Sequence, residues 1–100
     1  MPDKAWKQFE RRIARRFGGK RTGPTNKEDV SHPTYSIECK LLSRPSFGEI
    51  QAAVEQAETH CPAGKVPVAV IKKKYKEDKD ALAVMRLETF LERFDTSASA

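Results

Sequence analysis

Hydrophobic residues along this chain have helical spacing in some segments and strand-like spacing in others, and few folds are compatible with the order of these segments. From Trp6 to Phe17 the hydrophobic residues recur every three or four positions, which predicts an amphipathic helix over residues 3–17. Gly18 and Gly19 follow at once, and glycine commonly ends a helix. The chain therefore begins with a helix that has one face for a core.

Strand-like spacing follows in three places. Residues 35–42 alternate hydrophobic and polar side chains, which is typical of a half-buried strand. Residues 66–71 and 81–87 are nearly continuous hydrophobic runs and predict two strands of the core. Residues 18–27 are rich in glycine and cations and predict a basic loop, with a short strand at residues 20–22.

Two further helices separate and follow these strands. Ser46 and Glu49 have the spacing of a capping box, so a helix is expected over residues 47–61. A short final helix is expected over residues 89–94, and residues 95–100 are predicted to be a frayed tail. Helices that flank a small mixed sheet in this order predict an α/β or α+β fold.

Size and charge narrow the class of protein. One hundred residues, of which 38% are hydrophobic and 33% charged, predict a single globular domain, because a disordered chain has fewer hydrophobic residues. The net charge of +5 favours a polyanionic partner over a neutral metabolite. Nine Lys or Arg side chains against two carboxylates give residues 1–27 a charge of +7, whereas the rest carries −2. The basic character therefore belongs to the N-terminal part.

Targeting segments and cysteine motifs do not stand out. No hydrophobic run approaches the roughly 20 residues that span a bilayer, and the N-terminus lacks the hydrophobic stretch of a signal peptide, so a cytoplasmic protein is expected. Cys39 and Cys61 are accompanied only by His32 and His60, without the spacing of a zinc site. Both cysteines are expected to be free, mostly buried thiols.

The strand at residues 35–42 carries one chemical motif. Glu38 and Lys40 project from the same face, because strand side chains alternate with period two. A carboxylate can bind a hard divalent cation, and a nearby lysine can orient or deprotonate a water and balance the charge of an attacked phosphate. Asp29, across a plausible hairpin, could supply a second metal ligand, and the Cys39 carbonyl lies between the two side chains. The same motif would also suit a solvated outer face with an exposed ion pair.

Glu10 is a carboxylate at the edge of the hydrophobic stripe of the first helix. An acid that faces a core is expected to be paired, protonated or bound to metal. If Glu10 points toward Asp29 and Glu38, the three carboxylates form a cluster that needs a cation. The alternative is an ion pair between Glu10 and Arg11 or Arg15.

Glu10 in the first helix, then Asp29, then Glu38-x-Lys40 together resemble the PD-(D/E)XK nuclease superfamily, and within it the compact Holliday junction resolvases of archaea and their phage relatives. The resemblance covers about residues 3–94 and implies a restriction-endonuclease-like αβββαββα core. The family pattern has proline before its first aspartate. Here Glu28 stands at that position, and Glu28 could exchange roles with Asp29.

The resemblance implies a hydrolase, an endonuclease that depends on magnesium or manganese and cleaves phosphodiester bonds. Asp29, Glu38 and the Cys39 carbonyl would hold the metal, Glu10 would complete or support the metal shell, and Lys40 would position the attacking water. The expected substrate is a four-way DNA junction, cut by a homodimer during DNA recombination or DNA repair in a bacterial, archaeal or phage-infected cell. The alternatives are a nicking or restriction-like nuclease of the same fold and a non-catalytic basic module that binds nucleic acid.

Phosphate contacts are expected from basic and hydroxyl side chains of the N-terminal part, unless its charge run is merely a solvated face. They are Lys7, Arg11, Arg15, Lys20, Arg21, Thr22 and Lys27, with Arg12 and Arg16 on the other flank of the helix. A second basic cluster at a hairpin tip is equally well explained by DNA contact and by solubility. It comprises Lys72, Lys73, Lys74, Lys76 and Lys79.

The remaining polar residues receive little functional weight from the sequence. His32 is predicted to be an exposed turn residue beside Pro33, and His60 to interact with the dipole at the C-terminus of its helix. Gln51, Glu55 and Gln56 line the second helix and are less favoured candidates for the site.

Overall fold

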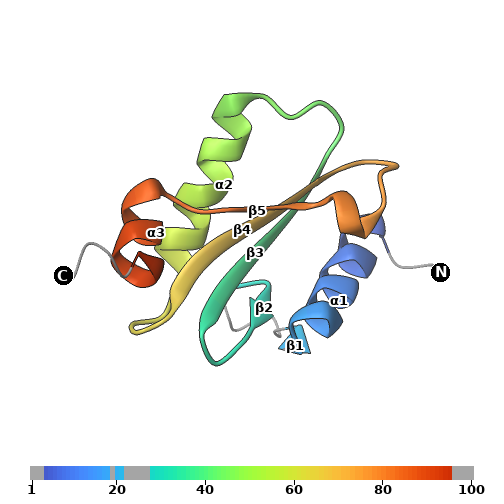
Figure 1. The fold of residues 1–100 in the computed structure, drawn as a ribbon. Coiled ribbons are helices and arrows are strands. Elements are labelled where there is room, and N and C mark those ends of the chain that lie inside the picture. Colours follow the sequence, from blue (N-terminus) through green and yellow to red (C-terminus); the bar gives the residue numbers. More distant parts are fainter. Residues whose placement is uncertain (1–3, 19, 22–27, 96–100) are drawn as a thin grey trace.

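The computed structural model describes residues 4–18, 20–21 and 28–95, and its elements follow the predicted order (Figure 1). They are α1 (Ala5–Phe17), β1 (Lys20–Arg21), β2 (Val30–Ser31), β3 (Tyr35–Leu42), α2 (Phe47–His60), β4 (Val66–Lys73), the 3₁₀ helix η1 (Asp78–Asp80), β5 (Leu82–Val84) and α3 (Leu87–Phe94). The predicted small mixed sheet with flanking helices is confirmed.

The strands form one five-stranded sheet in the order β1-β2-β3-β4-β5. β3 and β4 run parallel, because α2 carries the chain back between them, and the other neighbouring pairs are antiparallel. The central pair is in register over its full length, from Tyr35 opposite Val66 to Leu42 opposite Lys73. The parallel strands β3 and β4, connected by α2, form the centre of the sheet.

Each face of the sheet packs against one long helix. On one face Phe9 and Ile13 of α1 are buried against Ile37, Val68 and Val70. On the other face the side chains of Ala53 and Val54 from α2 meet Ala69 and Ile71. The alternation of β3 therefore sends Ile37 and Cys39 toward α1, and Glu38 and Lys40 toward the side covered by α2.

The helix ends follow the predicted signals. Gly18 ends α1 with φ of 68°, a left-handed conformation that glycine adopts without strain. Ser46 and Glu49 form the capping box of α2: Ser46 Oγ accepts from Glu49 N–H at 3.2 Å and Glu49 Oε1 accepts from Ser46 N–H at 3.4 Å. Both thiols are free, with Cys39 buried and Cys61 half-buried beyond the end of α2.

Three predictions about the core and its boundaries were wrong. The run at residues 81–87 is a strand only at Leu82–Val84, which is the last strand of the sheet in the described part of the chain, and Leu82 is 62% exposed. The final helix begins at Leu87, two residues earlier than predicted, and none of its residues is buried. Trp6 is 45% exposed and not a core residue, since it lies in the first turn of α1.

A polar contact fastens the β4–β5 connection onto α1. Asp78 of η1 accepts hydrogen bonds from Arg12 Nε at 2.6 Å and from the buried Lys72 Nζ at 2.7 Å. These cations lower the pKa of the Asp78 carboxyl from 3.8 to about 2, chiefly through the Arg12 hydrogen bond. Lys72 is thus an internal ion-pair partner that also lies over the Phe9 ring, not part of an exposed hairpin tip.

No helix in the described part of the chain is both long enough and apolar enough to cross a membrane.

Candidate active site

A pocket of about 400 Å³ opens beside the edge of β3 and contains all four side chains that the motif predicts. Glu10, Asp29, Glu38 and Lys40 come from α1, from the residue before β2 and from β3. The remaining lining residues are Trp6, Cys39, Leu41 and Gln56. The fold therefore gathers chemically active groups that are up to 30 positions apart in the sequence.

The shortness of β2 creates this pocket. β2 pairs with β3 only at Ser36 and Ile37, so in the described part of the chain the edge of β3 beyond Asp29 has no strand partner on that side. Because Val30 lies opposite Ile37, one further step of the register places Asp29 opposite Glu38. Asp29, Glu38 and Lys40 thus share one stretch of sheet edge between α1 and α2.

Asp29 is oriented by the backbone of β3. Its Oδ2 accepts a hydrogen bond from Cys39 N–H at 2.8 Å. The N–H and C=O of one strand residue point to the same edge of a sheet, so the Cys39 carbonyl also faces the open edge. The predicted backbone ligand is therefore on the pocket side of the strand.

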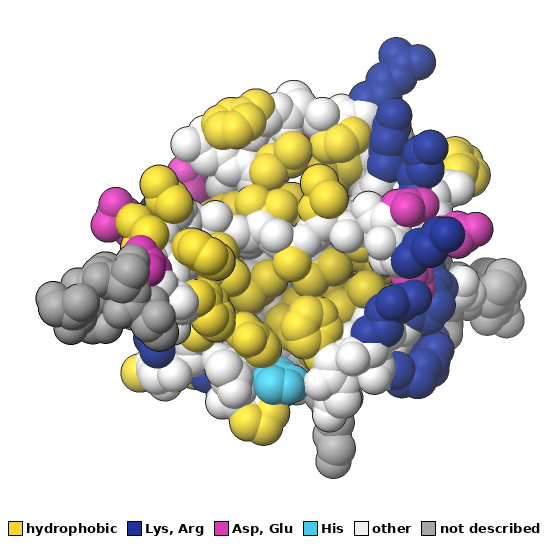
Figure 2. All heavy atoms as spheres, viewed as in Figure 1, with side chains coloured by type: hydrophobic (Ala, Val, Ile, Leu, Met, Phe, Trp, Pro, Cys, Tyr) yellow, Lys and Arg dark blue, Asp and Glu magenta, His cyan; other side chains and the backbone are white. Residues whose placement is uncertain are grey.

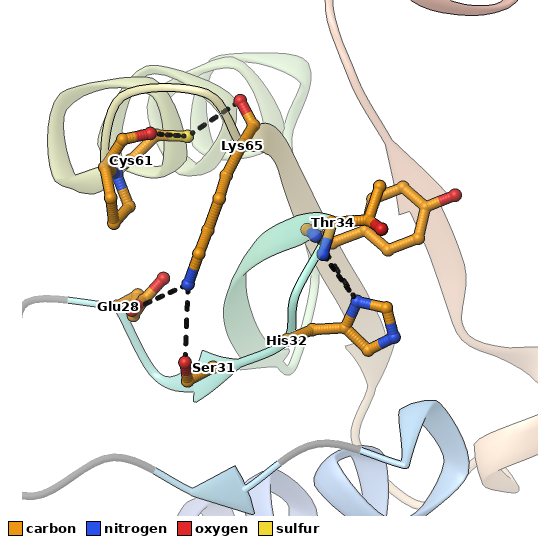
Figure 3. A network of polar contacts seen from close by, with 8 residues as sticks. Glu28, Ser31, His32, Thr34, Cys61 and Lys65 are labelled. Carbon is orange, nitrogen blue, oxygen red and sulfur yellow. Dashed lines mark hydrogen bonds and ion pairs between the residues drawn. The ribbon is translucent and has the colours of Figure 1, made fainter.

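Glu28, the acid that could exchange roles with Asp29, lies elsewhere. It is buried, with Oε1 3.7 Å from the ammonium nitrogen of Lys65, which also donates to Ser31 Oγ at 3.4 Å (Figure 3). Glu28 does not line the pocket. Of the two adjacent acids, only Asp29 is placed for chemistry at the edge of β3.

Glu38 is the most deeply buried acid of the pocket, at 2% exposed, which contradicts the alternative of a solvated outer face. Its Oε1 lies 2.7 Å from Nδ1 of His60, at the end of α2. The pKa of the Glu38 carboxyl is raised overall. Burial raises it most, the His60 hydrogen bond lowers it, and the charge of Asp29 raises it again. Two facing carboxylates repel each other, and a bound cation would remove that repulsion.

Glu10 is buried on the inner edge of α1, as its place beside the hydrophobic stripe predicts. Its charge is close enough to the Cys39 thiol to raise the pKa of that group, after burial and Asp29 and ahead of Glu38. The charges of Asp29, Glu10 and Glu38 therefore all affect the Cys39 thiol on β3. The buried thiol itself is held in its neutral form.

The donors of the pocket suit a hard divalent cation, because carboxylate and carbonyl oxygens are the ligands of magnesium and manganese. Asp29, Glu38 and the Cys39 carbonyl are the residues that could hold such an ion, with Glu10 beside them. Among residues 4–18, 20–21 and 28–95, no three His, Cys, Asp or Glu side chains are already arranged as a metal site.

Gln56 was a less favoured candidate for the site, and the sequence did not indicate a contact between His60 and Glu38. Gln56 lines the pocket and His60 contacts Glu38, and the two lie one helical turn apart. The signal was their spacing of four on a helix that must pack on the Glu38 face of β3. His60 lies in the last turn of α2, as predicted. His32, which was predicted to be exposed, is half-buried and accepts from Thr34 N–H at 3.0 Å (Figure 3).

Basic side chains gather on the side of the molecule where α1 and the β4–β5 connection lie (Figure 2). Lys7 is half-buried with its ammonium 5.6 Å from the centre of the Trp6 ring at the pocket, Arg11 is half-buried and Arg15 is exposed. Lys20 and Arg21 form β1, whereas Thr22 and Lys27 lie outside the described residues. Arg12 is engaged with Asp78.

No protein-family model, no curated protein and no solved structure matches this chain.

Proposed function

We propose that this chain is a magnesium- or manganese-dependent endodeoxyribonuclease that hydrolyses phosphodiester bonds of branched DNA, with four-way junctions as its substrate. One observation carries the proposal: Glu10, Asp29, Glu38 and Lys40 converge in one open pocket at the edge of β3. Each of these groups suits a role in phosphodiester hydrolysis. In the sequence, the same four residues resemble the pattern of the PD-(D/E)XK nucleases.

The residues of the pocket divide the chemistry between them. Asp29, Glu38 and the Cys39 carbonyl would hold the ion, which when bound polarises a phosphoryl oxygen and lowers the pKa of water. Lys40 is half-buried on the same strand face as Glu38, so its ammonium can orient a water and balance charge on the phosphate. Glu10, which α1 brings to the same pocket, would support the ion.

The shape of the surface supports a nucleic-acid strand as ligand. A second hollow of about 210 Å³ shares Lys40 and Gln56 with the pocket and continues along α2 past Leu42 and Glu49. On the other side, Lys7 and Arg15 of α1 supply cations for phosphate groups. A strand laid across the edge of β3 would have the reactive groups in the middle of its path.

The β4–β5 connection adds a second set of cations. Lys73, Lys74 and Lys76 are exposed, whereas Lys79 is 3.5 Å from Glu77. Lys74 N–H donates to the Leu42 carbonyl at 2.8 Å, so this segment leaves the sheet close to the pocket end of β3. The contact of Asp78 with α1 holds it there, and we therefore count these three lysines as phosphate contacts.

We also propose that the enzyme is a symmetric homodimer, because two cuts across a four-way junction need two sites. β5 and α3 expose large hydrophobic side chains that a second copy of the chain would cover. They are Leu82, Leu87, Phe90 and Phe94.

A non-catalytic basic module is the alternative from another functional class. The buried acids argue against it, because Glu10 and Glu38 place negative charge beside the surface that would meet phosphates. A passive binder gains nothing from such groups, whereas a metal-dependent hydrolase needs them.

The test is cleavage of labelled DNA in magnesium or in EDTA. The substrates are a synthetic four-way junction, a linear duplex of matched sequence and a flap. The proposal predicts paired nicks on the junction alone, and only with the metal. Equal cutting of all three substrates would favour a nicking or restriction-like nuclease, and tight binding without any cutting would favour the non-catalytic module.

A further inference from the structure

His60 ends α2 and directs its ring toward β3. Its Nδ1 lies 2.7 Å from Glu38 Oε1, and the side chains of His60 and Glu38 are 24% and 3% exposed. The contact is therefore largely shielded from water. When Glu38 is ionised its carboxylate can only accept hydrogen bonds, so the imidazole then donates from Nδ1.

Asp29, the neighbouring acid of the pocket, is likewise oriented by a hydrogen bond to one of its oxygens. Asp29 Oδ2 accepts from Cys39 N–H at 2.8 Å. Each of the two carboxylates thus has one oxygen held by an internal donor, and the two carboxyl groups also contact each other. A cation bound between them would meet both side chains and replace that contact. Donors of this kind behind a metal-binding carboxylate fix its orientation and raise the affinity of the site.

We propose that His60 is a positioning residue of the metal site: it holds Glu38 through Oε1 so that the remaining oxygen meets a hard divalent cation. This inference rests on the proposed function, which assigns Glu38 to the metal. It adds α2 to the site, since the carboxylate on β3 is aligned by the last residue of the crossover helix.

The assignment also explains why Gln56 and His60 face the same strand. They are one turn apart on α2, where Gln56 lines the pocket and His60 lies behind Glu38. The helix therefore supplies one residue toward the open space and one toward the carboxylate. A movement of α2 relative to β3 would change the position of Glu38.

The test measures Mn²⁺ binding to the DNA-free protein by titration calorimetry. His60→Ala should weaken Mn²⁺ binding about 10- to 100-fold, the range typical for the loss of such a supporting hydrogen bond. His60→Asn places an amide N–H near the position of Nδ1 and should recover most of the affinity. His32→Ala is the matched control, because His32 is also half-buried but its Nδ1 accepts from Thr34 N–H instead of contacting Glu38.

A second readout separates positioning from general damage to the fold. In junction cleavage, His60→Ala should raise the Mg²⁺ concentration for half-maximal rate and leave the KM for DNA unchanged. Circular dichroism and thermal unfolding verify that each variant is folded. If His60→Ala were too unstable, the comparison of folded His60→Asn with a folded His60→Gln variant, whose longer amide misplaces the donor, would decide the matter.

The outcomes are distinguishable. If the wild-type protein binds Mn²⁺ and cleaves DNA while His60→Ala does both equally well, the role of His60 is refuted and the proposed function stands. If the wild-type protein neither binds Mn²⁺ nor cleaves, both are refuted. Weakened metal binding in His60→Ala that His60→Asn restores supports the proposal.

Discussion

Replacing Asp78 by asparagine should destabilise the fold at neutral pH and have a smaller effect in acid. The Asp78 carboxylate is 13% exposed and accepts from Arg12 at 2.6 Å and from Lys72 at 2.7 Å. These contacts join η1, β4 and α1. An asparagine side chain at this position would keep an acceptor oxygen but lose the charge that both cations face.

The size of the effect follows from the pKa of this group. A carboxyl whose pKa falls from 3.8 to about 2 on folding contributes about 2.4 kcal/mol at neutral pH. Arg12 is 39% exposed, so solvent screening reduces the expected loss toward about 1.5 kcal/mol. For a domain of this size such a loss lowers Tm by roughly 10 °C.

The sign of the pH dependence is fixed by the direction of the pKa change. Because the folded-state pKa is the lower one, the contribution is complete above the unfolded pKa of 3.8 and is lost as the pH falls toward about 2. About half of it should remain near pH 3. The difference in stability between the wild type and Asp78→Asn should shrink accordingly.

Urea unfolding followed by circular dichroism at pH 7, 5, 4 and 3 measures this difference. Glu77→Gln is the matched control, because Glu77 and Lys79 form an exposed pair that should contribute less than about 1 kcal/mol. A stabilising charge on Asp78 is excluded if Asp78→Asn costs no more unfolding free energy than Glu77→Gln at pH 7, or if its cost is the same at pH 3 as at pH 7.

Two further predictions concern DNA binding and the core. Joint replacement of Lys73, Lys74 and Lys76 by alanine should reduce the slope of log Kd for junction DNA against log salt by up to about 2.7, or about 0.9 per lost phosphate contact. Arg93→Ala on α3 should leave the slope unchanged, and equal slopes for the wild type and the triple variant would exclude the three lysines as contacts. Phe9→Ala should cost about 3 to 5 kcal/mol of unfolding free energy, because this fully buried ring is the largest side chain of the α1 core. A loss below about 1 kcal/mol in urea unfolding would contradict that description of the core.

The sequence was most informative where one local signal decided the structure. The alternation of residues 35–42 predicted the bounds of β3, and the capping box at Ser46 predicted the start of α2. The glycine after Phe17 predicted the end of α1. These features depend on periodicity and on helix termini, which are properties of short segments.

The sequence was less informative where burial depends on what lies across the sheet. The run at residues 81–87 has the composition of a core strand, yet it lies at the edge of the sheet and Leu82 is exposed. Lys72 looked like one more surface lysine, and its burial became visible only with Asp78 placed against α1. In both cases the tertiary partner, not the local pattern, determines the environment.

The candidate site shows the same division. Alternation of β3 predicted that Glu38 and Lys40 share a face, and the amphipathic pattern of α1 predicted that Glu10 points inward. The spacing of Gln56 and His60 indicates a shared helix face, but the contact of His60 with Glu38 depends on the crossing position of α2 on β3. The choice between Glu28 and Asp29 likewise required the register of β2.

The rate at which Glu38→Gln cleaves a four-way junction in Mg²⁺, relative to the wild type and at saturating enzyme, tests the metal-dependent nuclease most directly. Glutamine can still accept the His60 hydrogen bond, so the substitution removes the charge and largely keeps the geometry. We expect a loss of at least about 100-fold in rate, with junction binding in EDTA unchanged or tighter. A variant that cleaves the junction as fast as the wild type would contradict it.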